Sequence, residues 1–261
     1  TISTNEGYLL VDVTDDGVSK GPVTTYTINP VIGPHTVTAK FRQLESWVRR
    51  YNNNAMNGND EAKAIAVHKL SGNVYVTGYS IGPTTGADYY TISYNGDGIQ
   101  NWSGRYDGPA HLGDYATAVA VDNAGNAFVT GYGYRGMVVK HSDYATLKYD
   151  NLGKRVWDVQ YDDRRNGNDE ARAIALDNLE FVYITGRSED SLSKTSPKHY
   201  DYYTIKYNPS TGSQVWAARY DNNLQSADEA TGIAVDSWGN VYVTGRSYGG
   251  TTTDFDYATI K

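Results

Sequence analysis

Short runs of alternating apolar and polar residues dominate this chain, and one set of runs recurs four times. The last copy reads DEATGIAVD at residues 228–236, VYVTG at 241–245 and DYATIK at 256–261. A period of two residues is typical of β-strands with one buried face. In the second copy it predicts strands at residues 115–121, 126–131, 143–148 and 155–161. No stretch has a helical period of useful length, so we expect an all-β fold.

A tryptophan marks one strand of each copy and recurs every 55 to 59 residues, at Trp47, Trp102, Trp157 and Trp216. Four-stranded antiparallel units with a period of about 40–60 residues are typical of propeller blades. No Trp strand follows Lys261, whereas the Trp strand at residues 45–51 has no copy in front of it. We therefore expect a four-bladed β-propeller over residues 44–261. In it, residues 45–51 pair beside the strand of Tyr257 and remove two open sheet edges.

Residues 1–43 lie outside the repeat and alternate with the same period of two. They predict three strands, at residues 8–13, 23–28 and 35–41, with a hairpin turn at Asp15-Asp16-Gly17. Three strands are close to the lower limit for a sheet that is stable alone. We therefore expect a partial β-module that depends on other contacts, and its open strand edges could add a strand from a second copy.

The repeat also resembles a known family. Its consensus of DEAxxIAVD, GNVYVTG, DYxTIKY and VWxxRY is similar to the SBBP-type β-propeller repeat of bacteria and archaea, over residues 45–261. Family propellers often have more than four blades, so a larger ring stays open. In the third copy Leu179-Glu180-Phe181 replaces the Gly-Asn pair, and we expect that turn to differ.

Residues 7–41 resemble the second half of a divergent InlB B-repeat, a module of bacterial surface proteins. The first half of that module is missing. The resemblance implies an extracellular or cell-surface location, and we expect the chain to begin inside a domain of a longer precursor.

Composition narrows the classes of partner. The net charge of −7 argues against nucleic acid, which needs a basic surface. No apolar run reaches the roughly 18 residues of a membrane span. The chain has no cysteine, which removes disulfides and thiolate metal sites.

Aspartates of the repeat are the candidate ligand residues. Strand direction places the loops between blades and the loops after each second strand on one face, where function is expected. That face carries two rings of aspartates: Asp60, Asp114, Asp169 and Asp228, and Asp88, Asp143, Asp201 and Asp256. Clustered carboxylates suit Ca²⁺, which takes 6–8 oxygen ligands. Alternatively, each carboxylate accepts backbone N–H groups and holds its own turn.

These observations favour a non-catalytic structural, adhesive or self-assembling module, which could form filaments. A second hypothesis is a module that binds a surface polysaccharide or a peptide through loops 132–143 and 188–201, the most divergent pair. The third is a glycoside hydrolase or lyase, since paired carboxylates perform that chemistry. We expect no enzyme, because the acids repeat symmetrically and no pair differs from the others.

Overall fold

The computed structural model describes residues 1–4, 8–30, 32–43, 47–53, 58–82, 84–135, 141–163, 167–190, 199–222, 226–250 and 253–261. These residues form eighteen strands joined by turns and loops. In this part of the chain there is no helix of a length and apolarity that could span a membrane. The chain divides into two compact units, Thr1–Arg49 and Arg50–Lys261.

The first unit contains one antiparallel sheet in which β1 (Tyr8–Asp15) lies between β2 (Val18–Ser19) and β3 (Val37–Gln43). The predicted hairpin turn is confirmed, because Asp16 and Gly17 both adopt positive φ, at 48° and 81°. The predicted strand at residues 23–28 is wrong, since these residues lie outside strands. Gly21 turns the chain away with φ of 76°, and Pro22 then offers no N–H for a ladder.

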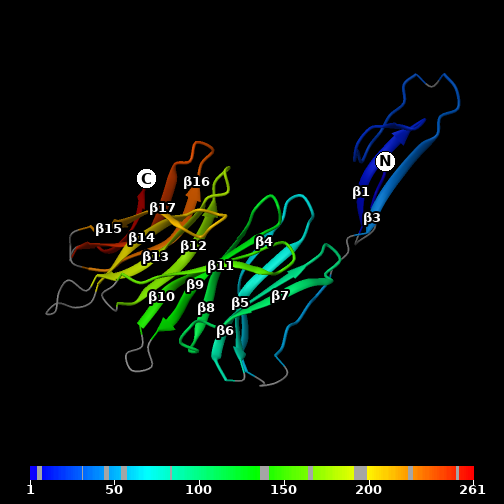
Figure 1. Ribbon diagram of the computed structural model, residues 1–261. Coiled ribbons are helices and arrows are strands. Elements are labelled where there is room, and N and C mark those ends of the chain that lie inside the picture. The colour runs from blue at the N-terminus through cyan, green and yellow to red at the C-terminus, as the bar shows by residue number, and fades with distance from the viewer. Residues whose placement is uncertain are drawn as a thin grey trace. The chain divides into compact units, whose positions relative to one another are not determined.

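The second unit consists of four antiparallel sheets, each a simple meander in chain order (Figure 1). The first sheet is β4 (Asp60–Val67), β5 (Val74–Gly82), β6 (Gly86–Tyr94) and β7 (Gln100–Tyr106). The second is β8 (Asp114–Val121), β9 (Ala127–Arg135), β10 (His141–Tyr149) and β11 (Arg155–Tyr161). The third is β12 (Asp169–Leu176), β13 (Val182–Asp190), β14 (His199–Tyr207) and β15 (Gln214–Tyr220). The fourth is β16 (Asp228–Val235), β17 (Val241–Gly250) and β18 (Asp254–Ile260). The all-β prediction and the antiparallel units of the repeat are confirmed.

The second strand of each sheet contains a Thr-Gly pair, and its glycine lies opposite a β-bulge in the first strand. In the third sheet the register shifts between Ala171 and Ala173, opposite Gly186. A Cβ on Gly186 would lie 2.0 Å from the carbonyl oxygen of Glu170. The same close approach recurs at Gly78, Gly131 and Gly245. The bulge brings two backbones together so closely that only glycine fits there.

Each sheet packs against the next one in the chain, and a buried tyrosine of its third strand connects the two. The hydroxyl of this tyrosine donates to a main-chain carbonyl on the third strand of the following sheet. The three donor–acceptor pairs are Tyr89 with Ala145, Tyr144 with Tyr203, and Tyr202 with Ala258, at 3.1, 3.1 and 3.3 Å. Consecutive sheets are therefore held by both apolar packing and a repeated hydrogen bond.

The turn between the first two strands of the third sheet has the same main-chain hydrogen bonds as those of the second and fourth sheets, so the expected difference is wrong. The N–H of Asp177 donates to Phe181 and the N–H of Glu180 donates to Asp177. Asp122 and Gly125 make the same bonds in the second sheet. Glu180 keeps the turn by adopting a left-handed φ of 65°.

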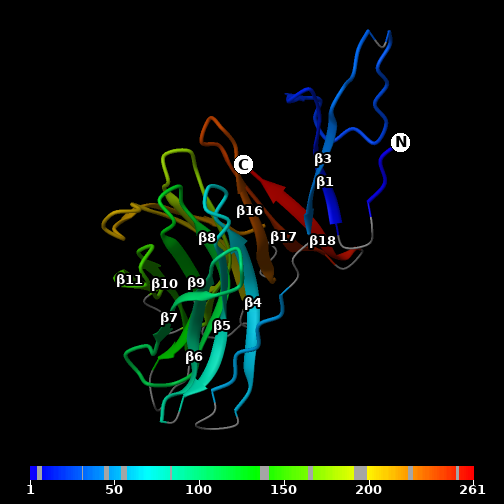
Figure 2. The same cartoon turned by 90° about the vertical axis from the view of Figure 1, so that its right-hand side faces the viewer.

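The structure does not confirm the predicted closure of the ring by residues 45–51. The fourth sheet has three strands, and β18 pairs with β17 alone among the described residues (Figure 2). Residues 47–53 lie outside strands, and residues 45 and 46 lie outside the described part of the chain. Instead, Tyr51 stacks on Tyr90 of the first sheet, with ring centroids 4.2 Å apart. This contact holds the end of the Trp segment against the first sheet.

Candidate functional site

Aspartates from consecutive sheets form groups on one side of the second unit. On this side the third strand of one sheet and the first strand of the next sheet both begin. Each group has three positions: the start of a third strand, the residue after a fourth strand, and the first residue of the following sheet. The groups are Asp88, Asp107 and Asp114; Asp162, Asp163 and Asp169, which Asp143 and His141 adjoin through Asp162; and Asp201, Asp221 and Asp228. In the first and third groups, one oxygen of each carboxylate lies within 4.8 Å of one oxygen of the others.

In the first group, one oxygen of each carboxylate has a partner. Oδ2 of Asp88 accepts from Arg105 at 2.8 Å, Oδ2 of Asp107 contacts Nδ1 of His111 at 2.5 Å, and Oδ2 of Asp114 accepts from the N–H of Gly108 at 2.7 Å. Oδ1 of Asp88 and Oδ1 of Asp107 are buried and have no hydrogen-bond partner among the described residues. In this group Oδ2 of every carboxylate is held by the protein, and two buried Oδ1 atoms accept no hydrogen bond.

The third group repeats this arrangement two sheets later. Arg219 donates to Oδ2 of Asp201 at 2.6 Å, and the N–H of Asn222 donates to Oδ2 of Asp228 at 3.1 Å. Oδ1 of Asp201 and Oδ1 of Asp228 are buried and lack a hydrogen-bond partner in the described part of the chain. Both side chains are 0% exposed, so solvent does not supply the missing partner.

The second group contains one more acid and a different cation. Gln160 stands at the position of Arg105 and Arg219, and Arg135 of β9 supplies the guanidinium instead, with Nε 3.0 Å from Oδ2 of Asp143. Arg135 also donates to Oε1 of Gln160 at 2.6 Å. The charge that the fourth strand loses at Gln160 is thus restored from the second strand.

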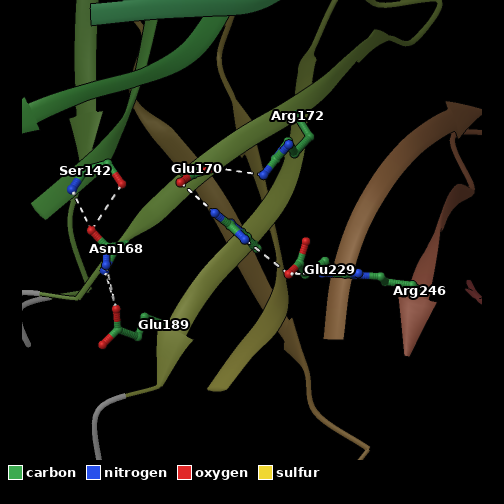
Figure 3. Close-up of polar contacts among 8 residues, drawn as sticks. Ser142, Asn168, Glu170, Arg172, Glu189, Glu229 and Arg246 are labelled. Carbon is green, nitrogen blue, oxygen red and sulfur yellow. Dashed lines mark hydrogen bonds and ion pairs between the residues drawn. The ribbon is translucent and has the colours of Figure 1, made fainter. Parts of the chain in front are cut away.

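The loop that leads into the second group is anchored by Asn168 (Figure 3). Its Oδ1 accepts from the N–H of Ser142 at 3.2 Å, and its Nδ2 donates to Glu189 at 2.9 Å. Asn168 therefore joins the third strand of the second sheet to the third sheet, directly before Asp169. This position keeps Asp169 close to Asp143.

Burial raises the pKa of these aspartates. It brings the pKa of Asp114 and of Asp169 to about 7, and the pKa of Asp143 to about 8, with neighbouring carboxylates adding to the shift. Burial also raises the pKa of Asp88 and of Asp201, against the opposing effect of their arginine partners. Ionisation of these buried carboxyl groups therefore costs free energy, and a nearby cation would remove that cost.

A chain of ion pairs links the third and fourth sheets at their inner strands (Figure 3). Arg187 donates to Glu170 at 2.8 Å and to Glu229 at 3.1 Å, so one guanidinium joins two sheets. Arg246 donates to Glu229 and Arg172 donates to Glu170, each at 2.8 Å. Both glutamates of this network are paired with arginines, and the network stabilises the sheet interface.

Comparison with known proteins adds one match. A family model described as a β-propeller repeat, SBBP, matches residues 223–250. Residues 223–250 are therefore similar to the SBBP β-propeller repeat. This segment begins just before Asp228 of the third group and extends to the end of β17. Among curated proteins, none matches the chain.

The three groups contain six of the eight predicted ligand residues. Asp88, Asp114, Asp143, Asp169, Asp201 and Asp228 lie in the three groups and are at most 2% exposed. Asp60 and Asp256 belong to no such group among the described residues. The N–H of Asn53 holds Oδ2 of Asp60 at 2.9 Å, as in the other sheets, whereas Asp256 lies on the exposed strand β18.

Sequence reasoning missed the middle aspartates of the three groups, Asp107, Asp162 and Asp221. The signal is an aspartate directly after the tyrosine that ends each fourth strand, as in RYD at residues 105–107 and 219–221. The divergent loops 132–143 and 188–201 include residues 136–140 and 191–198, which lie outside the described residues.

Proposed function

We propose that this β-propeller repeat protein is a non-catalytic structural module that assembles head to tail, with β18 accepting a strand from a second copy. The observation that carries the proposal is the exposure of Tyr257. The equivalent tyrosines Tyr89, Tyr144 and Tyr202 are at most 1% exposed, whereas Tyr257 is 89% exposed. A large aromatic residue of an interior motif, open to solvent on an unpaired edge strand, is typical of an interface.

The two ends of the sheet series are complementary. The carbonyls of Ala145, Tyr203 and Ala258 each accept a threonine hydroxyl from their own sheet and a tyrosine hydroxyl from the preceding sheet. In the first sheet the corresponding carbonyl, that of Tyr90, accepts from Thr77 at 3.5 Å. The exposed Tyr257 carries the hydroxyl group that corresponds to the tyrosine donors at this position in the other sheets.

Residue Tyr51 supports the same arrangement. Tyr161, at the end of the second sheet, stacks on Tyr203 of the third sheet with centroids 4.4 Å apart. Tyr51 stacks on Tyr90 of the first sheet at 4.2 Å. Tyr51 therefore occupies the place that a preceding sheet fills elsewhere. Beside it lies a pocket of about 580 Å³, lined by residues that include Asn52, Asp60 and Tyr79.

The proposal includes an extracellular or cell-surface location, which the resemblance of residues 7–41 to a surface module supports. It assigns no catalytic role to the aspartates, because the first and third groups repeat one arrangement. A glycoside hydrolase needs two carboxyl groups in different environments. Protease treatment of intact cells would digest a surface-exposed protein and leave an internal one unchanged.

Engineered cysteines test the assembly directly, because the chain has none of its own. In the third sheet Tyr202 is paired with Tyr220, so the repeat predicts that Tyr257 pairs with Tyr51. We expect the variant Tyr51→Cys/Tyr257→Cys to form disulfides between copies under mild oxidation. Non-reducing electrophoresis would then show a ladder of multimers that increases with protein concentration.

The control is Val48→Cys/Tyr257→Cys, in which the second cysteine lies three residues out of register. This control should give no ladder. A mixture of the single variants Tyr51→Cys and Tyr257→Cys at low concentration should give no ladder either. A cross-linked monomer alone would mean that residues 45–51 close the ring of their own chain. Absence of any cross-link would mean that β18 accepts no such strand, and both results overturn the proposal.

A further inference from the structure

We propose that the three aspartate groups bind calcium, one ion between each pair of consecutive sheets. The sites lie within one chain, so this inference goes beyond the proposed assembly and does not depend on it. It rests on the geometry of Asp88, Asp107 and Asp114, and on its recurrence in the two following sheet pairs.

Buried oxygens without partners are the first argument. A buried carboxylate oxygen that accepts no hydrogen bond is costly, and such atoms are rare in folded proteins. Here Oδ1 of the aspartate at the start of each third strand, Asp88, Asp143 and Asp201, has no hydrogen-bond partner among the described residues. The same is true of Oδ1 of Asp107, Asp169 and Asp228, and four of these six residues are 0% exposed. Recurrence of the same unpartnered atom in one place of each repeat points to a ligand that all three groups share.

Positioning of the remaining oxygens is the second argument. Backbone N–H groups hold Oδ2 of Asp114 and Asp228, and guanidinium groups hold Oδ2 of Asp88 and Asp201. Oδ1 of Asp88, Asp201 and Asp228 is buried and accepts no hydrogen bond among the described residues. In these three carboxylates one oxygen is held by the protein, and the other is left for a cation.

Charge balance is the third argument. Three ionised carboxylates and one arginine leave two negative charges in the first and third groups. One divalent cation neutralises them. All donors are hard oxygens, and oxygen atoms up to 4.8 Å apart can share an ion with ligand distances of 2.3–2.6 Å. Calcium tolerates the irregular geometry of such a site and completes its shell with water, whereas magnesium requires a near-ideal octahedron.

An ion in each group would join the third strand of one sheet to the first strand of the next. It would act close to the tyrosine hydrogen bond described above, because Asp88 directly precedes Tyr89 on β6. Calcium would thus add to the apolar packing and the hydrogen bonds that hold consecutive sheets together.

The test uses the full chain, stripped with EDTA and dialysed. Titration with CaCl₂ in a calorimeter should give three bound ions per chain. Terbium should bind in their place and luminesce by transfer from nearby tyrosines. The melting temperature should rise by about 5 °C or more in excess CaCl₂ over EDTA. MgCl₂ at the same concentration should give a smaller rise.

The variants Asp107→Asn, Asp162→Asn and Asp221→Asn should each lower the stoichiometry from three to two. A matched control is Asp158→Asn, an exposed aspartate that pairs with Arg155, which should still bind three. Circular dichroism checks that each variant keeps its fold. If the unaltered chain shows no heat of binding, no terbium luminescence and one melting temperature in EDTA and CaCl₂, the inference is wrong. Magnesium binding as tight as calcium binding would overturn the choice of ion.

Discussion

Glu180 occupies the backbone conformation that Gly125 occupies one sheet earlier, with φ of 65° and 82° respectively. The left-handed region costs a residue with a Cβ about 1 kcal/mol, and glycine is free of that cost. Oε1 of Glu180 also accepts from the N–H of Asn123 at 3.1 Å, which offsets part of the strain. The third sheet therefore keeps a common turn with an unfavourable residue.

Replacing Glu180 tests the strain in this turn. We expect Glu180→Gly to be more stable than Glu180→Ala by about 1 kcal/mol, because both variants lose the contact with Asn123 and only glycine relieves the backbone. The free energy of unfolding, from denaturant titration, measures the difference. Equal stability of the two variants would show that φ at this position is not strained.

Glycine at the bulges leads to a second prediction. A Cβ at Gly186 would lie 2.0 Å from a main-chain oxygen, which only a shift of the strands could relieve. We expect Gly186→Ala to lower the free energy of unfolding by about 3 kcal/mol or more. Gly96→Ala is the control, since no atom lies within 4 Å of the Cβ that it would add. A loss at Gly186 no larger than that at Gly96 would contradict the steric argument.

The repeat made most of the architecture predictable from sequence, because alternation and turn residues are local signals. The four antiparallel units follow from these signals, whereas the close approach of two backbones at Gly186 is visible only in the structure. The turn at Glu180 was not readable, because the hydrogen bonds of its neighbours outweigh the preference of a single residue. The strand expected at residues 23–28 failed for a related reason, since Gly21 diverts the chain before the alternating run begins.

The candidate site was predictable only in part. Asp88 and Asp114 are visible as repeated residues, but their proximity arises from the docking of two sheets. Asp107 looks like a loop residue in the sequence, and only the end of β7 places it between the other two. Whether the ring closes depends on a contact between segments that are far apart in the sequence. In the structure Tyr51 stacks on Tyr90 of the first sheet and does not lie beside Tyr257. Such contacts are decided by tertiary packing, which no local pattern encodes.

The tyrosine hydrogen bond between sheets gives a third prediction. Tyr202→Phe removes the donor to Ala258 within a buried interface, and we expect a loss of about 1 kcal/mol in the free energy of unfolding. Tyr257→Phe removes the equivalent hydroxyl from an exposed residue. In monomeric protein it should change stability by less than about 0.5 kcal/mol. Similar losses in the two variants under dilute conditions would mean that Tyr257 already has a partner in the monomer.

Glu229 gives the last prediction, which concerns acid stability. Burial opposes its ionisation, but the hydrogen bond from Arg246 and the charges of Arg187 and Arg246 outweigh burial, so its pKa is lower than the ordinary 4.5. A lowered pKa in the folded state means that the stabilisation is present above pH 4.5. It is lost as the pH falls through the folded-state value, where the carboxylate takes up a proton.

We expect Glu229→Gln to lower the free energy of unfolding by about 2 kcal/mol at pH 7, since two guanidinium groups lose their shared partner. The difference from the unaltered chain should shrink as the pH falls from 4.5 through the lowered pKa of Glu229. Below that pKa both proteins are neutral at this position. Glu61 is the matched control, at the same place in the first sheet, with its side chain 50% exposed. Solvent screens its pair with Lys63, so Glu61→Gln should have a much smaller effect. A difference for Glu229 that stays constant from pH 7 to pH 3 would show that its charge does not stabilise the interface of the third and fourth sheets.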